Sequence, residues 1–402
     1  MVVVLHSRVV GPLEPFAGGF AAELTRQGYT VGAASHQLGL VAHLSRWMAS
    51  RWLAPVDLTA PEIERYVRAR RARGYRLFRS AKALGPLLGY LRRLEVISEV
   101  VASPAQTPAE LYLQRYRDYL IRERGMGVRS VRGYLDLVGP FIEHHVGDGA
   151  GVRGLTTADV TSFLVAESRR LSPKTTQRLA SALRSLLRYW HVQGVTDLPL
   201  VAAVPKVAYR SSNVPRGLAP DEVAALLDSC DHAQRGGLRD FAMLTLLSRV
   251  GLRAGEVAGL RLGDIDWRSG EFIVAGKGCR RDRLPLPGDV GQAIADYLQH
   301  GRPAQALDRC VFIRIKAPHQ GLSAGGVTQA VAAAAHRAGL GTIYAHRLRH
   351  SAATSMLTAG ATLTEIGQVL RHRRPSTTST YAQVHTEALR TLARPWPTES
   401  MS

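Results

Sequence analysis

The amino-acid sequence predicts a mainly helical protein with one small antiparallel β-sheet, an α+β fold. Amphipathic runs with apolar residues at helical spacing cover residues 111–124, 131–145 and 174–193. The clearest strand signals lie in the C-terminal half, at 272–274 and 283–286, and a further strand is expected at 310–313. With 402 residues, 46% of them hydrophobic, the chain is large enough for two or three domains with real cores.

A weak internal repeat divides the N-terminal half into two helical modules after an N-terminal segment, residues 1–15. The pattern of residues 58–67 returns at 155–164, and that of 87–91 returns at 186–190. Self-similarity at a nearly fixed offset is typical of repeated structural units. We therefore expect one helical module at 16–103 and a second at 104–197.

The remainder of the chain is predicted to be a linker, a larger domain and a tail. Three prolines and a Ser-Ser-Asn run between residues 198 and 220 indicate an extended linker. The domain at 221–394 should be mostly helical and contain the small sheet. A short helix is expected at 386–392, and two prolines begin the tail at 395–402.

The composition is strongly basic and poor in cysteine. A formal charge of +20 and a pI near 10.6 create a field suited to nucleic acid, although a proteome rich in arginine would give the same balance. Three isolated cysteines indicate neither a disulfide framework nor a zinc ribbon and fit a reducing cytoplasm. The apolar run at residues 1–5 is too short for a signal sequence or a membrane span. A cytoplasmic protein without a membrane partner is expected.

A dense basic run lies in the first module, from Arg65 to Arg73, with Arg76 and Arg79 close behind. The run is predicted to lie on or beside a helix. It could contact DNA, read a separate arm site, or form a solvated face that offsets the acids of a partner subunit. Contact with DNA is the interpretation that we favour.

Three residues of the C-terminal domain combine permanent positive charge with a titratable ring. Arg253 lies in a tight turn between the apolar run 241–247 and the start of a new helix. His346 and Arg349 stand three positions apart, so they share one face of a helix. Because a guanidinium group is planar and stays charged, two such groups can grip the non-bridging oxygens of a phosphate.

Three more residues extend this set. Lys277 lies in a Gly-Lys-Gly turn between two strands, at the tip of a predicted hairpin. The run 362–365 is a capping box, so the helix that it opens ends near His372, and Tyr381 follows about one turn into another helix. A tyrosine hydroxyl, with a pKa of about 10, needs neighbouring cations and a base to act as a nucleophile. The six residues together suit attack on a phosphodiester.

Each of these residues also has a purely structural interpretation. With 47 arginines and only five lysines, a single arginine is ordinarily a solvated surface charge, and a hairpin lysine usually faces water. His346 and His350 have the i, i+4 spacing of metal ligands, but no third ligand accompanies them and we expect no metal site. Tyr381 alone would be a packed aromatic residue. The joint order and spacing over about 130 residues is what favours chemistry.

These motifs resemble the tyrosine recombinases, also called the phage integrase family. Gly-Leu-Arg-x-x-Glu at 251–256, Gly-Lys-Gly at 276–278, His-x-Leu-Arg-His-Ser at 346–351 and Leu-Arg-His at 370–372, followed by Tyr381, stand in the family's order. The resemblance implies a site-specific DNA recombinase or integrase without cofactor or metal. Tyr381 would attack the scissile phosphate, form a 3′-phosphotyrosine link and free a 5′-hydroxyl.

The resemblance also assigns roles to the six residues. Arg253 and Arg349 would clamp the phosphate, His346 would act as base toward Tyr381, and Lys277 would protonate the leaving oxygen. His372 would hydrogen-bond the phosphate, and Glu256 would support the site from behind. One departure is Arg347, which stands where the family commonly has an acidic residue. The extra module at 16–103 is a larger departure from the minimal member.

Within the same resemblance, the module at 104–197 corresponds to the core-binding, SAM-like DNA-binding domain. Its basic residues are expected to contact phosphates, although each could equally be a surface charge; they include Arg129, Arg132, Lys174 and Arg178. Double-stranded DNA is the implied partner, with a homo-tetramer on two DNA sites, alone or beside partner recombinases. The extra module favours a gene carried by a mobile element, a phage or a transposon. A type IB topoisomerase-like enzyme and a non-catalytic DNA-binding accessory subunit are the alternatives.

Overall fold

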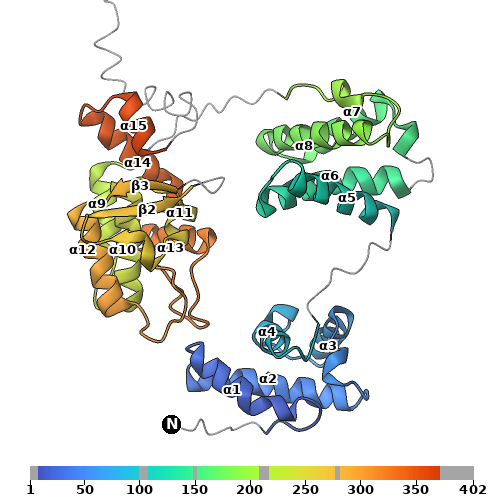
Figure 1. Cartoon of the computed structure of the whole chain (residues 1–402), viewed down its shortest axis with the longest axis horizontal. Coiled ribbons are helices and arrows are strands. Elements are labelled where there is room, and N and C mark those ends of the chain that lie inside the picture. Colours follow the sequence, from blue (N-terminus) through green and yellow to red (C-terminus); the bar gives the residue numbers. More distant parts are fainter. Residues whose placement is uncertain (1–7, 99–106, 148–151, 208–216, 277–280, 372–402) are drawn as a thin grey trace, which may run out of the picture. The chain divides into compact units, whose positions relative to one another are not determined.

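The structure, a computed structural model, describes residues 8–98, 107–147, 152–207, 217–276 and 281–371 (Figure 1). The chain divides into two compact units, Val100–Ser212 and a unit formed by Met1–Glu99 with Asn213–Ser402. Among its described residues, the second of these units contains two large hydrophobic cores and a small cluster of Ala353, Ile366 and Leu370. The mostly helical fold with one three-stranded antiparallel sheet confirms the predicted fold class. The domain boundaries stay predictions.

The N-terminal core is built from four helices: α1 (Glu14–Arg26), α2 (Val31–Ala49), α3 (Ala60–Ala72) and α4 (Gly85–Arg93). The hydroxyl of Thr30 accepts the N–H of Ala33 and so caps the start of α2. Phe20 of α1 is fully buried, and its ring centroid lies 5.6 Å from that of Tyr90 on α4. Aliphatic side chains from all four helices fill the space around this contact.

The unit Val100–Ser212 is a second helical bundle, made of α5 (Pro108–Arg122), α6 (Val128–Gly147), α7 (Thr157–Arg170) and α8 (Pro173–Val192). The three predicted amphipathic runs are confirmed as α5, α6 and α8. Capping boxes begin α5 and α7, because each N-cap threonine exchanges hydrogen bonds with an acidic residue three positions later. Trp190 of α8 is fully buried among the apolar side chains at the centre.

The internal repeat is visible as matching local structure and burial. Leu58 and Leu155 are both buried, and a helix begins two residues after each, α3 at Ala60 and α7 at Thr157. In the second pair of segments, the leucines of 87–91 lie in α4 and those of 186–190 in α8, with the same positions buried. The two modules therefore use corresponding apolar positions to close their cores.

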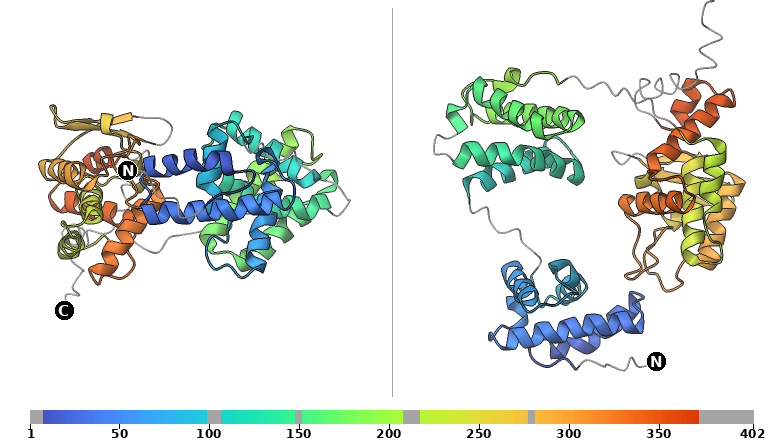
Figure 2. Two further views of the ribbon diagram at one scale, coloured as in Figure 1. Left: turned by 90° about the horizontal axis from the view of Figure 1, so that it is seen from below. Right: turned by 180° about the vertical axis from the view of Figure 1, so that it is seen from behind.

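The C-terminal core joins helices to the small sheet. Its elements are α9 (Pro220–Asp228), α10 (Arg235–Arg249), α11 (Ala254–Gly259), β1 (Ile265–Asp266), β2 (Glu271–Ala275), β3 (Arg281–Pro285), α12 (Gly288–Asp296), α13 (Ala324–Arg337), α14 (Ala345–Thr358) and α15 (Leu363–Val369). The strands run in the order β1-β2-β3 and form one layer beside the helices of this part of the chain (Figure 2). Phe272 pairs with Leu284, and both side chains enter the core.

One strand prediction is wrong. Residues 310–313 form no ladder and make only isolated bridges, from Cys310 to Arg261 and from Ile313 to Gly321. Val311, Phe312 and Ile313 are all fully buried, so this run lacks the alternate exposure of a strand with one wet face. The third strand is instead β1, which has only two residues and was too short to predict. Among the described residues, no helix is long and apolar enough to cross a membrane.

Candidate active site

Arg253 is the N-cap residue of α11 and lies two residues after Gly251, whose left-handed backbone conformation favours glycine. Gly251 has φ +67°, and a Cβ atom there would lie 2.5 Å from a methyl group of Leu370. The backbone N–H of Arg253 donates to Glu256 Oε2 at 2.8 Å, and its Nη1 donates to Glu256 Oε1 at 2.7 Å. Glu256 is buried, whereas the Arg253 side chain is 45% exposed. The carboxylate thus holds an open guanidinium group in place.

Arg349, unlike Arg253, is almost completely buried. Its side chain on α14 is only 1% exposed, and Nη1 donates to the carbonyl oxygen of Gly251 at 2.5 Å. Its Nη2 donates to the carbonyl oxygen of Leu370, at the end of α15. A single guanidinium group therefore joins three elements, namely the turn before Arg253, the helix α14 and the end of α15.

His346 lies one turn before Arg349 on α14 and is exposed. Its ring contacts that of His350 edge to face, with centroids 4.3 Å apart. No group of three His, Cys, Asp or Glu residues that could hold a metal ion occurs in the described part of the chain. Arg347, the departure from the family pattern, points instead toward the linker end and donates to the carbonyl of Gly217 at 3.5 Å.

Three predicted site residues, Lys277, His372 and Tyr381, lie outside the described residues. The residues on both sides of the connection that contains Lys277, and those before His372, are described. Ala275 of β2 pairs with Arg281 of β3, so the predicted hairpin is confirmed and Lys277 belongs to its connection. The capping box of Thr362 and Glu365 begins α15 as predicted, and His372 follows Val369, the last residue of that helix, by three positions. The catalytic roles of all six residues stay predictions.

The structure adds a residue that the sequence analysis passed over. Arg371 donates from Nη2 to Glu256 Oε2 at 2.7 Å, and its side chain is only 10% exposed. Burial lowers the pKa of this guanidinium group, while the adjacent Glu256 carboxylate opposes the shift. The contact spans 115 positions in the sequence, so no local pattern pointed to it. Arg371 and Arg253 therefore share a single buried carboxylate.

The four basic residues predicted to contact DNA are all exposed and gather on one part of the second bundle. Arg129 and Arg132 are three positions apart on α6, and Lys174 and Arg178 are four apart on α8. A Cβ atom at Gly133 would lie 3.1 Å from Nη2 of Arg178, so α8 presents its cation beside α6 at this point. Both pairs lie in the first two turns of their helices, where the helix dipole adds positive potential.

The basic run of the first module is also ordered into one surface. Nε of Arg70 donates to the carbonyl of Leu77, and Nε of Arg71 donates to the carbonyl of Arg79, so two arginines tie the following loop back to α3. The exposed cations of this segment are Arg65, Arg68, Arg71, Arg73, Arg76, Arg79 and Lys82. The sequence contains no acidic residue between Glu64 and Glu95. The side chains of residues 65–94 therefore carry no negative charge.

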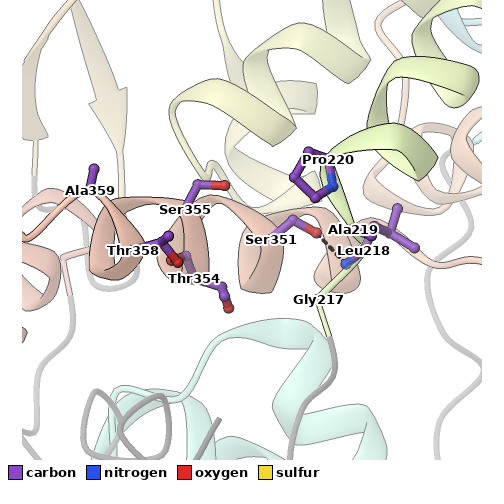
Figure 3. A pocket seen from close by; sticks show the side chains of 9 residues that line it. All are labelled: Gly217, Leu218, Ala219, Pro220, Ser351, Thr354, Ser355, Thr358 and Ala359. Carbon is purple, nitrogen blue, oxygen red and sulfur yellow. Dashed lines mark hydrogen bonds between the residues drawn. The ribbon is translucent and has the colours of Figure 1, made fainter. Parts of the chain in front are cut away.

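A pocket of about 580 Å³ lies on the other side of α14 (Figure 3). The residues drawn there are Gly217, Leu218, Ala219, Pro220, Ser351, Thr354, Ser355, Thr358 and Ala359. The hydroxyl of Ser351 accepts the N–H of Leu218 at 2.7 Å and anchors the chain that enters α9. None of the described residues that line the pocket is charged. Ser351 stands two positions after Arg349, about 200° around the helix, so this pocket is separate from the arginine cluster.

Comparison with known proteins agrees with the motif pattern. Residues 216–388 match the Phage integrase family, and residues 113–194 match the Phage integrase N-terminal SAM-like domain. The chain is 39% identical to the putative integrase/recombinase y4rA of Sinorhizobium fredii over 97% of its own length and 96% of the relative. It is 32% identical to the tyrosine recombinase XerD of Mycobacterium leprae, over 69% of this chain and 94% of the relative.

Solved structures share the fold at low sequence identity. A post-cleavage complex of XerH with a palindromic difH substrate has a TM-score of 0.56 at 18% identity and covers 84% of this chain and 95% of that one. A lambda integrase dimer bound to a core site has a TM-score of 0.55 at 15% identity, covering 81% and 91%. On the strength of the family match and the full-length relative, the chain belongs to the phage integrase family of tyrosine recombinases.

Proposed function

We propose that this protein is a site-specific DNA recombinase that cuts and rejoins strands through a covalent bond between Tyr381 and a 3′-phosphate. The observation that carries the proposal is the joining of the predicted residues across the fold. Arg349 of α14 bonds to the carbonyl two residues before Arg253, and Glu256 fixes the Arg253 guanidinium group from behind. Residues nearly a hundred positions apart in the sequence are thereby held as one rigid cationic cluster.

In the proposed reaction the Tyr381 oxygen bonds to the scissile phosphorus while the bond to the 5′-oxygen breaks. His346 accepts the tyrosine proton, and Lys277 donates a proton to the departing 5′-oxygen. The half-exposed Arg253 contacts the non-bridging oxygens, and the buried charge of Arg349 stabilises the negative charge that develops on them. In the reverse step a new 5′-hydroxyl attacks the phosphotyrosine and displaces Tyr381, which rejoins the strands. No energy source is needed, because the phosphotyrosine bond conserves the energy of the phosphodiester.

Double-stranded DNA is the proposed substrate, held mainly through its phosphates. The cations of α6 and α8 form one contact surface, and the loop after α3 forms a second, within the first module. A lambda integrase tetramer bound to a Holliday junction and the XerH complex with difH substrate are among the structural neighbours. The lambda integrase tetramer supports a homo-tetramer on two DNA sites for this chain. The full-length similarity to a putative integrase supports an origin in a mobile element.

The decisive experiment traps the covalent intermediate on nicked suicide duplexes built from the ends of the element or genomic region that encodes the gene. Wild-type protein and Tyr381→Phe are incubated with labelled duplex, with and without a chelator, and separated on a denaturing gel. We expect a chelator-resistant protein-DNA band from wild type alone, with equal non-covalent binding by both proteins. A band of equal intensity from Tyr381→Phe would refute the assignment. If both proteins bind the duplexes but neither forms a covalent band on any of them, the accessory-subunit alternative would be favoured.

A further inference from the structure

Arg371 combines three features that a purely structural role does not explain. Its backbone has φ +54°, a left-handed conformation that glycine adopts freely and arginine does not. Its side chain is nine-tenths buried, although arginine is rarely buried without full pairing. Within the described part of the chain, its Nε and Nη1 atoms are buried and have no hydrogen-bond partner. A glycine here would avoid all three penalties.

The position of Arg371 links it to the rest of the cationic cluster. The preceding carbonyl, that of Leu370, accepts a hydrogen bond from Arg349, which fixes the backbone from which Arg371 extends. Among the described residues, its guanidinium group donates one hydrogen bond, to Glu256 Oε2, while Glu256 Oε1 accepts from Arg253. Both oxygens of the carboxylate are therefore occupied, each by a different arginine side chain.

The net charge of Arg253, Glu256 and Arg371 shows what Arg371 adds to the cluster. Arg253 and Glu256 alone would form a neutral pair, and the carboxylate would compete with a phosphate for the arginine. With Arg371 bonded to the other oxygen, the three side chains together keep one net positive charge in a partly buried setting. Electrostatic interactions act most strongly in such a setting, because little water screens them. Arg371 thus offsets the negative charge of Glu256, the carboxylate that orients Arg253.

We propose that Arg371 is a positioning residue for strand cleavage, which holds Glu256 and keeps Arg253 oriented and electrostatically available to the phosphate. The inference rests on the proposed recombinase function. Arg371 acts through Glu256 and Arg253 rather than on the DNA, because the two guanidinium nitrogens that lack partners are closed off from solvent. The role is distinct from those of the six residues that the motifs assign.

The test measures single-turnover cleavage of the suicide duplex and non-covalent DNA affinity for Arg371→Met, Arg371→Lys and Arg371→Gly. We expect Arg371→Met to lower the cleavage rate about 10- to 100-fold, with affinity changed less than about twofold, since one contact behind the site is lost. Arg371→Lys should recover part of the rate, because a lysine can still bond to Oε2. Arg371→Gly relieves the backbone conformation, so it should fold and yet cleave as slowly as Arg371→Met.

A double substitution separates positioning from mere packing. If Arg371 works by offsetting the Glu256 charge, Glu256→Gln should restore part of the rate lost in Arg371→Met. If Arg371 had only a structural role, the losses of cleavage rate from the two substitutions would add, or the double variant would lose more than their sum. Arg337→Met serves as control, because this exposed arginine also bonds to a backbone carbonyl, that of Ser229, and lies outside the cluster. It should cleave like wild type.

The outcomes of this test and of the test of function can be told apart. Wild-type rates from Arg371→Met and Arg371→Gly would overturn the positioning role while leaving the recombinase assignment intact. A further loss in the double variant, or equal losses of affinity and cleavage, would also overturn it. If wild type forms no Tyr381-dependent covalent band, the recombinase assignment fails, and the role of Arg371 fails with it.

Discussion

Removal of the Arg349 side chain should release the end of α15 from the rest of the C-terminal domain. Arg349→Ala deletes two hydrogen bonds from a buried guanidinium group to the carbonyls of Gly251 and Leu370. A hydrogen bond with one charged partner contributes about 1.5–3 kcal/mol, and both carbonyls lie where water enters poorly. We therefore expect about 3–6 kcal/mol of lost stability, concentrated where α14, α15 and the turn before α11 meet.

Hydrogen exchange followed by mass spectrometry can locate this loss, which a single melting temperature of a multidomain chain cannot do. Amides of Leu363–Val369 should exchange at least about a hundredfold faster in Arg349→Ala, up to the limit set by free opening. Those of α12, Gly288–Asp296, should keep their rates. Arg349→Lys should be intermediate, because a single ammonium group does not span two carbonyls as a planar fork does.

Arg337→Ala is the matched control, since this arginine is exposed and also bonds to a carbonyl. It should leave α15 unchanged. Normal exchange in α15 of Arg349→Ala, with cleavage lost, would refute the reasoning. Arg349 would then act only on the phosphate and not as the joint between these three elements.

Two further predictions concern DNA contact and the close packing at Gly251. Replacing Lys174 and Arg178 together by glutamine should weaken DNA binding and reduce the slope of log K against log salt by about 1.8, measured by fluorescence anisotropy. An unchanged slope would remove both residues from the interface. Gly251→Ala should destabilise the packing of α15 against this turn by about 1–3 kcal/mol, because the added Cβ would meet Leu370 and the φ of residue 251 is +67°. Faster hydrogen exchange of the α15 amides would report the loss. Gly288→Ala is the control, because a Cβ there has no described atom within 4 Å.

The sequence predicted those features that have a local signature. Amphipathic spacing located α5, α6 and α8, and the capping box of Thr362 and Glu365 located the start of α15. The order of motifs also pointed to Arg253 and Arg349. The prediction of a strand at 310–313 failed because residues 311–313 are all fully buried, and an all-apolar run looks the same in a strand and in an irregular core segment.

What the sequence could not provide is the set of contacts between residues far apart along the chain. Arg371 meets Glu256 across 115 positions, and Arg349 meets the Gly251 carbonyl across 98. In the second case the acceptor is a backbone atom, so no side-chain pattern marks it. Among 47 arginines, nothing in the sequence alone separates Arg371 from a surface charge. Tertiary packing decides which arginines are buried, and only the structure records it.

The contrasting exposure of the two predicted phosphate-binding arginines has a physical rationale. A guanidinium group that must receive a phosphate has to be reachable, and one that holds elements together has to be enclosed. Arg253 is open and held from behind by a carboxylate, whereas Arg349 is closed and spans two carbonyls. Since the Gly251 carbonyl lies two residues before Arg253, any shift of Arg349 is transmitted to the open arginine. Catalysis that depends on fixed donors around a developing charge should therefore be as sensitive to the buried joint as to the exposed contact.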